Sequence, residues 1–159
     1  MDKQELERRT KKFAVSVIKF VGGFNSSASG RVVGHQLLKS GTSIGANYRE
    51  ANRSVSRREF VHKITIAEKE ASETVYWLEI CSETSLGNKD NCIQLEAEAN
   101  ELLAIFTSIG RSVRANDRKA DKSKDTRVTD KSYVEYGSEG LEMDIDDLLP
   151  KTMRVENGT

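Results

Sequence analysis

The chain is poor in the residues that disulfide scaffolds, rigid loops and β-sheet cores require. Its 159 residues include one proline and two cysteines, and aromatic residues make up only 6% of the total. No apolar run reaches the roughly 20 residues that a membrane-spanning helix needs. Charged residues, by contrast, account for 31%. This balance disfavours a β-sandwich, an α/β enzyme and a membrane protein, and it is typical of a helical bundle with solvated faces.

The balanced charge conceals an uneven distribution along the chain. Residues 1–115 carry 17 basic and 14 acidic side chains, whereas residues 116–159 carry 8 basic and 11 acidic ones. A mildly basic body with an acidic tail is compatible with nucleic-acid binding. The charged residues 1–5 are followed by no apolar stretch of membrane length. We therefore expect a cytoplasmic protein with reduced thiols.

Four amphipathic segments follow one another at about 5–21, 29–52, 57–85 and 90–113. Apolar or small residues recur every three or four positions in each segment, which is the repeat of a helix with one buried face. The third and fourth segments carry unbroken heptad seams. Because the connections are short, neighbouring helices should run antiparallel. The sequence predicts an all-α, up-down-up-down four-helix bundle over 1–115.

A run of small residues interrupts the second segment. Gly41 and Gly45 stand one turn apart, and each glycine costs a helix interior about 0.5–1 kcal/mol relative to alanine. Close approach of another helix would offset that cost. The polar residues Ser43, Asn47 and Glu50 flank the glycines and can satisfy polar groups at a tight contact. The pattern leaves open whether this contact lies within the bundle or between subunits.

The third segment has an apolar surface that is wider than one seam. Trp77 stands beside the seam residue Leu78, and Tyr76 precedes it. Tyrosine and tryptophan are enriched at protein interfaces. Together with the nearby Glu70 and Glu73, they suggest a contact beyond the chain's own core. Packing of Trp77 inside that core is the alternative.

Basic residues gather around the end of the second segment and the start of the third. Arg49, Arg53 and Arg57 are four residues apart, with Arg58 and Lys63 close by. We predict that this arginine cluster contacts nucleic-acid phosphates, the alternative being a solvated surface.

Two further arginines, Arg111 and Arg114, end the fourth segment. Their charge would also complement the helix macrodipole. They would join the arginine cluster only if the fourth helix ends beside the second.

The sequence offers no plausible active site. A carboxylate-bridged metal site in a bundle needs two Glu-x-x-His pairs. Glu59 and His62 form one such pair, but His35 has no matching glutamate. Cys81 lies on the heptad seam of the third segment, and Cys92 lies near the start of the fourth segment. No histidine is placed by sequence to activate Cys92, so we expect both thiols to be inert. We expect neither enzymatic activity nor a cofactor or metal.

Beyond residue 115 the apolar repeat stops, and residues 116–159 are expected to be a disordered tail. One segment, 141–149, mixes acidic and apolar residues just before the single proline. Such segments can fold on a partner. The alternative is a solvated tail that touches nothing.

Four stretches of the chain match a known family. Residues 30–37, 41–51, 70–74 and 77–79 resemble the 23S rRNA intervening-sequence proteins, a four-helix-bundle family that is similar in fold to the accessory variability determinant of diversity-generating retroelements. The resemblance covers about residues 5–115. It implies a ring-shaped homopentamer. In the retroelement branch the basic surface of the ring binds nucleic acid and a reverse transcriptase, so such partners are implied here too.

Together these observations favour a non-enzymatic, oligomeric adaptor or scaffold that binds RNA or DNA phosphates through a basic surface. The alternative is a structural protein-interaction module without a nucleic-acid role. That module would recruit a protein partner through its apolar face or its acidic tail.

Overall fold

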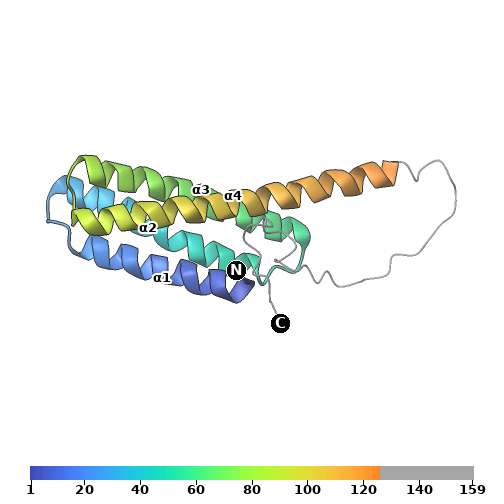
Figure 1. Cartoon of the computed structure of the whole chain (residues 1–159), viewed down its shortest axis with the longest axis horizontal. Helices are drawn as coiled ribbons and strands as arrows, with labels where there is room; N and C mark the ends of the chain where they lie inside the picture. Colours follow the sequence, from blue (N-terminus) through green and yellow to red (C-terminus); the bar gives the residue numbers. More distant parts are fainter. Residues whose placement is uncertain (126–159) are drawn as a thin grey trace, which may run out of the picture.

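The computed structural model contains four helices in sequence: α1 (Lys3–Gly22), α2 (Ala28–Ala51), α3 (Arg57–Glu83) and α4 (Lys89–Asp125). It describes the backbone of residues 1–125 and the side chains of residues 1–115. The predicted partner-binding segment 141–149 lies outside the described residues. Consecutive helices run antiparallel, and α4 returns alongside α1 (Figure 1). The predicted up-down-up-down bundle is confirmed.

Side-chain caps begin the first three helices. Their N-cap residues are Asp2, Ser27 and Ser56, each of which accepts a hydrogen bond from a backbone N–H of the first turn. At α3 the carboxylate of Glu59 also accepts from the backbone N–H of Val55 at 3.2 Å. These bonds satisfy amide groups that a helix start leaves unpaired, so the positions at which the helices begin follow from local sequence.

The predicted seams form the core. In α4 all six seam residues are buried: Leu95, Ala99, Leu102, Phe106, Ile109 and Val113. In α3 every seam residue from Ile64 to Cys81 is buried, whereas Phe60 at the start is only partly covered. The rings of Tyr48 and Phe106 meet edge to face with centroids 5.5 Å apart, which joins α2 to α4 across the bundle.

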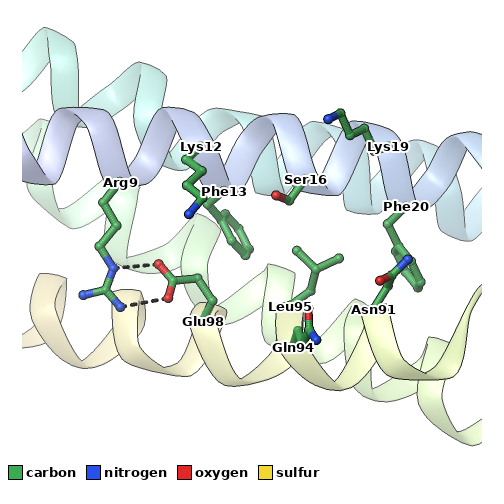
Figure 2. Close-up of a pocket in the computed structure, with 10 residues that line it drawn as sticks. All are labelled: Arg9, Lys12, Phe13, Ser16, Lys19, Phe20, Asn91, Gln94, Leu95 and Glu98. Atoms are coloured by element: carbon green, nitrogen blue, oxygen red, sulfur yellow. Dashed lines mark hydrogen bonds and ion pairs between the residues drawn. The ribbon is translucent and has the colours of Figure 1, made fainter.

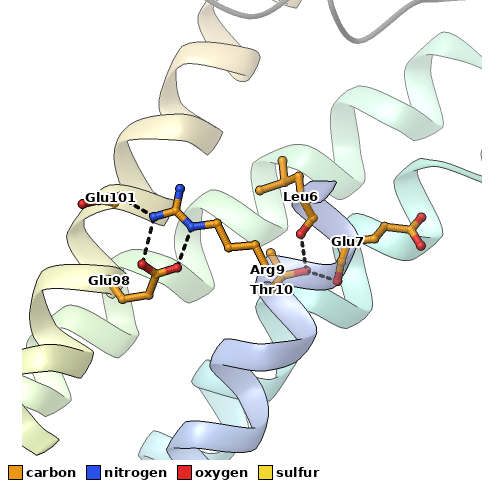
Figure 3. Close-up of polar contacts among 6 residues, drawn as sticks. All are labelled: Leu6, Glu7, Arg9, Thr10, Glu98 and Glu101. Carbon is orange, nitrogen blue, oxygen red and sulfur yellow. Dashed lines mark hydrogen bonds and ion pairs between the residues drawn. The ribbon is translucent and has the colours of Figure 1, made fainter. Parts of the chain in front are cut away.

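The glycines of α2 face α1. A Cβ atom on Gly41 would stand 3.1 Å from both methyl groups of Val17, and one on Gly45 would stand 3.2 Å from Oγ1 of Thr10. The hydroxyl of Thr10 donates to backbone carbonyls of its own helix (Figure 3). Its polar group is therefore satisfied without help from α2. Gly41 and Gly45 therefore pack against α1 within the bundle.

The end of α4 differs from the prediction. The apolar repeat stops near Asn116, yet the helix continues to Asp125 and projects beyond the other three helices (Figure 1). The segment 116–125 contains no glycine or proline and includes the good helix formers alanine, lysine and arginine. Without an apolar stripe, residues 116–125 have no face to pack against the bundle. The absence of that stripe does not prevent the backbone from being helical. The described backbone of α4 therefore extends past residue 115, where the sequence predicts the end of the bundle, as far as Asp125.

We predict that the close approach of α1 to α2 makes Gly41 intolerant of larger residues. Gly41→Leu should lower the free energy of unfolding by about 1–3 kcal/mol, because the added side chain must displace Val17. Gly22, with open space around its Cβ position, provides the control. Gly22→Ala should leave stability unchanged or raise it by about 0.5 kcal/mol. Urea denaturation measures both, and equal effects would contradict the packing role of Gly41.

Candidate nucleic-acid interface

One end of the bundle gathers basic residues from three helices. The turn between α2 and α3 lies beside α4, because Nη2 of Arg57 donates to the backbone carbonyl of Val113 at 2.9 Å. Arg111 and Arg114 therefore reach the same end of the bundle as Arg53. In the sequence analysis, Arg111 and Arg114 belong to the arginine cluster only on the condition that α4 passes beside the end of α2, and the Arg57 contact meets this condition. The N-terminus of α1 lies at this end as well (Figure 1).

A polar network holds the turn in place. The ammonium of Lys3 donates to the backbone carbonyl of Asn52 at 3.1 Å, and the amide of Asn52 donates to Glu7 at 2.7 Å. Both contacts join α1 to the residue at which α2 ends. They fix the direction in which the chain leaves α2, and so the positions of the arginines that follow.

Several predicted phosphate-binding residues already have partners. Nε of Arg49 lies 3.9 Å from the carboxylate of Glu7, and Lys63 forms an ion pair with Glu50. Arg57 is engaged with Val113 as described above. These three residues stabilise the structure at this end of the bundle. The sequence could not show this, because two of the contacts come from distant helices.

Three guanidinium groups at this end are exposed and form no ion pair with the carboxylates of residues 1–115. Among these residues, Arg53 donates to the backbone carbonyl of Arg49, at 3.1 Å. Arg58 and Arg111 are exposed and make no ion pair with any side chain in residues 1–115. We call Arg53, Arg58 and Arg111 the basic end. A planar guanidinium of this kind suits bidentate contact with phosphate oxygens.

Sequence reasoning missed a second basic surface. Helix α1 carries six basic and two acidic residues. Among them, Arg9 bonds through Nε to Glu98 at 2.6 Å and also pairs with Glu101 (Figure 3). The hydrogen bonds with these carboxylates raise the pKa of Arg9 well above its usual range, although its partial burial opposes this effect. The five basic residues within the predicted helix 5–21 were a signal that sequence analysis could have used.

Helices α1 and α4 border a groove of about 520 Å³ (Figure 2). Phe13, Phe20 and Leu95 form its apolar floor, and Lys12 and Lys19 stand on its α1 side. The pairing of α1 with α4 is the loosest between neighbouring helices of the bundle. The groove follows from that loose pairing, which no pattern within a single helix reveals.

The remaining predicted interface residues share the outside of α2 and α3. We call this the outer α2–α3 surface; its predicted members are Ser43, Asn47, Glu50, Glu70, Glu73 and Trp77. Trp77 is half-buried and packs against the core, while its indole N–H donates to Glu73 at 3.1 Å. Tyr76 meets the Trp77 ring edge to face and is 54% exposed. Trp77 thus belongs partly to the core and partly to this surface.

Glu70 is the most perturbed carboxylate of that surface. Its Oε2 atom is buried and has no hydrogen-bond partner among residues 1–115. Burial raises the pKa of Glu70 above its ordinary value, the charge of Glu73 adds to the rise, and Lys39 opposes it. An ionised Glu70 is therefore costly in the isolated chain.

The two cysteines are buried. The Sγ atom of Cys92 lies 3.5 Å from the carbonyl oxygen of Leu78. Burial raises the pKa of Cys92, opposite to the lowering that a helix N-terminus can cause, and raises that of Cys81 to about 12. Both thiols stay protonated near neutral pH. Across residues 1–115, no group of three histidine, cysteine, aspartate or glutamate side chains is placed to hold a metal ion.

The comparisons with known proteins agree with this fold. The sequence profile of the 23S rRNA-intervening sequence protein family matches residues 2–108. The chain belongs to this family. A crystal structure from Bacteroides thetaiotaomicron, described as a protein of unknown function from the S23 ribosomal protein family, is 35% identical with a TM-score of 0.61. The similarity covers 65% of this chain and 96% of that chain. The search of curated proteins finds no match.

The family match places limits on the site in this family member. It includes Arg53 and Arg58 but ends before Arg111. Within the basic end, Arg53 and Arg58 therefore lie inside the region that matches the family, and Arg111 lies outside it. In the helices that are described, none is long and apolar enough to cross a bilayer.

We predict a pH-dependent gain of stability on replacing Glu70. Because its pKa is raised in the folded chain, ionisation of Glu70 weakens folding at neutral pH. Glu70→Gln should therefore raise the free energy of unfolding of the monomeric chain at pH 7. The gain should shrink as the pH falls through the folded-state pKa and disappear below the ordinary value of 4.5.

Urea denaturation from pH 4 to pH 8 measures this effect. Glu79→Gln is the control, because Glu79 is an exposed carboxylate on the same helix. If Glu70→Gln lowered the free energy of unfolding at pH 7, or raised it equally at every pH, ionised Glu70 would not carry the cost of burial that we assign to it.

Proposed function

We propose that this protein is a non-enzymatic, oligomeric adaptor that binds nucleic-acid phosphates through its basic end. One observation carries the proposal: the Arg57–Val113 contact joins α3 to α4 and so brings Arg53, Arg58 and Arg111 to one end of the bundle. None of these three guanidiniums forms an ion pair with a described carboxylate. The family description refers to 23S rRNA, which favours RNA as the first ligand to test.

The proposed contact is with the backbone of the nucleic acid. Three separate guanidiniums at the end of a bundle can bind phosphates, and the residues do not form a helix face suited to a major groove. Binding should depend on salt, because each neutralised phosphate releases counterions. Structured RNA should therefore bind with little preference for sequence.

The proposed assembly is a ring, and a pentamer is the state implied by the family resemblance. The outer α2–α3 surface supports a contact between copies, since it combines the exposed Tyr76 with the unpartnered Oε2 atom of Glu70. Cyclic symmetry would place the basic end of every copy on the same side of the ring. Several weak phosphate contacts would then act together on one RNA molecule.

We predict that charge reversal at the basic end weakens RNA binding. The double variant Arg53→Glu/Arg58→Glu should bind structured RNA at least about tenfold more weakly at moderate salt, because two phosphate contacts become repulsive. The slope of log affinity against log salt concentration should become shallower by about 1.4–1.8. Arg49 and Arg57 are left intact, because both contribute to folding contacts.

The matched control reverses two exposed cations at the opposite end of the bundle. Arg31 lies in the first turn of α2, and Lys89 begins α4. Arg31→Glu/Lys89→Glu changes the net charge by the same amount and should retain most of the binding. Equal loss in the two double variants would show a nonspecific charge effect and contradict the site. A well-formed oligomer without RNA binding would favour the protein-interaction module.

We also predict that the outer α2–α3 surface holds the oligomer together. Tyr76→Glu should reduce the mass measured by sedimentation, because it places a charge in the contact between copies. Ile93→Glu is the control, since Ile93 is 52% exposed and lies on α4. A native mass for Tyr76→Glu, or a monomeric wild-type protein, would contradict this assembly.

A further inference from the structure

The groove between α1 and α4 combines an apolar floor with a cationic rim. Its floor residues Phe13, Phe20 and Leu95 belong to the edge of the core. The ammonium groups of Lys12 and Lys19 have no carboxylate partner within residues 1–115. Figure 2 shows Lys12 on the side of α1 that faces α4, whereas Lys19 extends on the other side of α1. The rim is therefore able to accept carboxylates without first breaking an ion pair.

The exposed side of α1 extends this surface. Arg8, Lys12, Val15 and Lys19 are spaced by four, three and four residues, which places them along one stripe of the helix. Val15 is exposed although apolar. The stripe thus presents three cations around one apolar side chain, next to the apolar floor of the groove.

The chain contains a segment of complementary chemistry. Segment 141–149 has four acidic residues and five apolar ones. Its residues Leu141, Ile145 and Leu148 are spaced by four and three, which is the repeat of one apolar helix stripe flanked by carboxylates. Acidic and apolar groups together match the cationic and apolar groups of α1 and its groove.

The length of chain favours a groove on another copy. Glu98 and Asp125 both lie on α4, and 27 residues of helix separate them by about 40 Å. The 15 residues 126–140 must cover that distance for docking within one chain. A chain of that length spans at most about 50 Å, and an unstructured one averages about 20 Å. Docking within the same chain would need almost full extension, whereas docking on a second copy would not.

We propose that the groove between α1 and α4 binds segment 141–149 of a second copy of this chain. The apolar residues of the segment cover Val15 and the groove floor, and its carboxylates pair with Lys12 and Lys19. The contact uses neither the basic end nor the outer α2–α3 surface. It therefore does not depend on the proposed nucleic-acid function and can link copies or rings.

A capture experiment with full-length, nuclease-treated chains tests this directly. The tagged bait keeps its groove but has its own segment disabled by L141S/I145S/L148S. The first prey keeps its segment but has its groove disabled by K12E/K19E, and the second prey carries both sets of changes. Any exchange of subunits through other surfaces contributes equally to the two preys. The bait should retain about tenfold more of the first prey than of the second.

Two further baits locate the contact. Adding K12E/K19E to the bait should remove the difference between the preys. Adding R31E/K69E, which reverses two exposed cations elsewhere, should preserve it. Equal capture of both preys by the first bait would overturn the proposal, as would a difference that survives K12E/K19E in the bait.

Discussion

The close approach of α1 to α2 is the constraint on which the rest of this structure depends. With no side chain at Gly41 and Gly45, α2 packs directly against Val17 and Thr10 of α1. On its other side α1 meets α4 only loosely, and the bidentate contact of Arg9 with Glu98 spans that gap. The position of α1 therefore accounts both for its tight packing against α2 and for the groove between α1 and α4. A bundle with larger residues in α2 would move α1 and alter both.

Antiparallel topology then divides the surface among separate roles. The N-terminus of α1, the α2–α3 turn and the middle of α4 meet at one end, where Arg57 joins α3 to α4. The proposed phosphate contacts use that end, whereas the proposed contacts between copies use the sides of the bundle. Glu70 and Trp77 lie on one side, and Lys12 and Lys19 on another. The proposed contacts with nucleic acid and with further copies of the chain therefore use different surfaces.

The sequence predicted the fold well because the decisive signals are local. Apolar or small residues at every third or fourth position identify the buried face of each helix. In the structure, Ser27 and Ser56 cap the starts of α2 and α3. The site was less predictable, because whether an arginine is free to bind a phosphate depends on the side chains that lie beside it in space. Arg49 is paired with Glu7 on α1, a contact between residues far apart in the chain. The groove was not predictable at all, since it arises from the unequal spacing of whole helices.

The central claim is that nucleic acid contacts one end of the bundle, and crosslinking tests it most directly. Ultraviolet crosslinking of the wild-type chain to structured RNA, followed by mass spectrometric mapping, reports the contacted peptides without any substitution. We expect crosslinks in residues 52–58 and around Arg111, with few in the turn between α1 and α2. Crosslinks concentrated in that opposite turn or along α1, with none at 52–58, would contradict it.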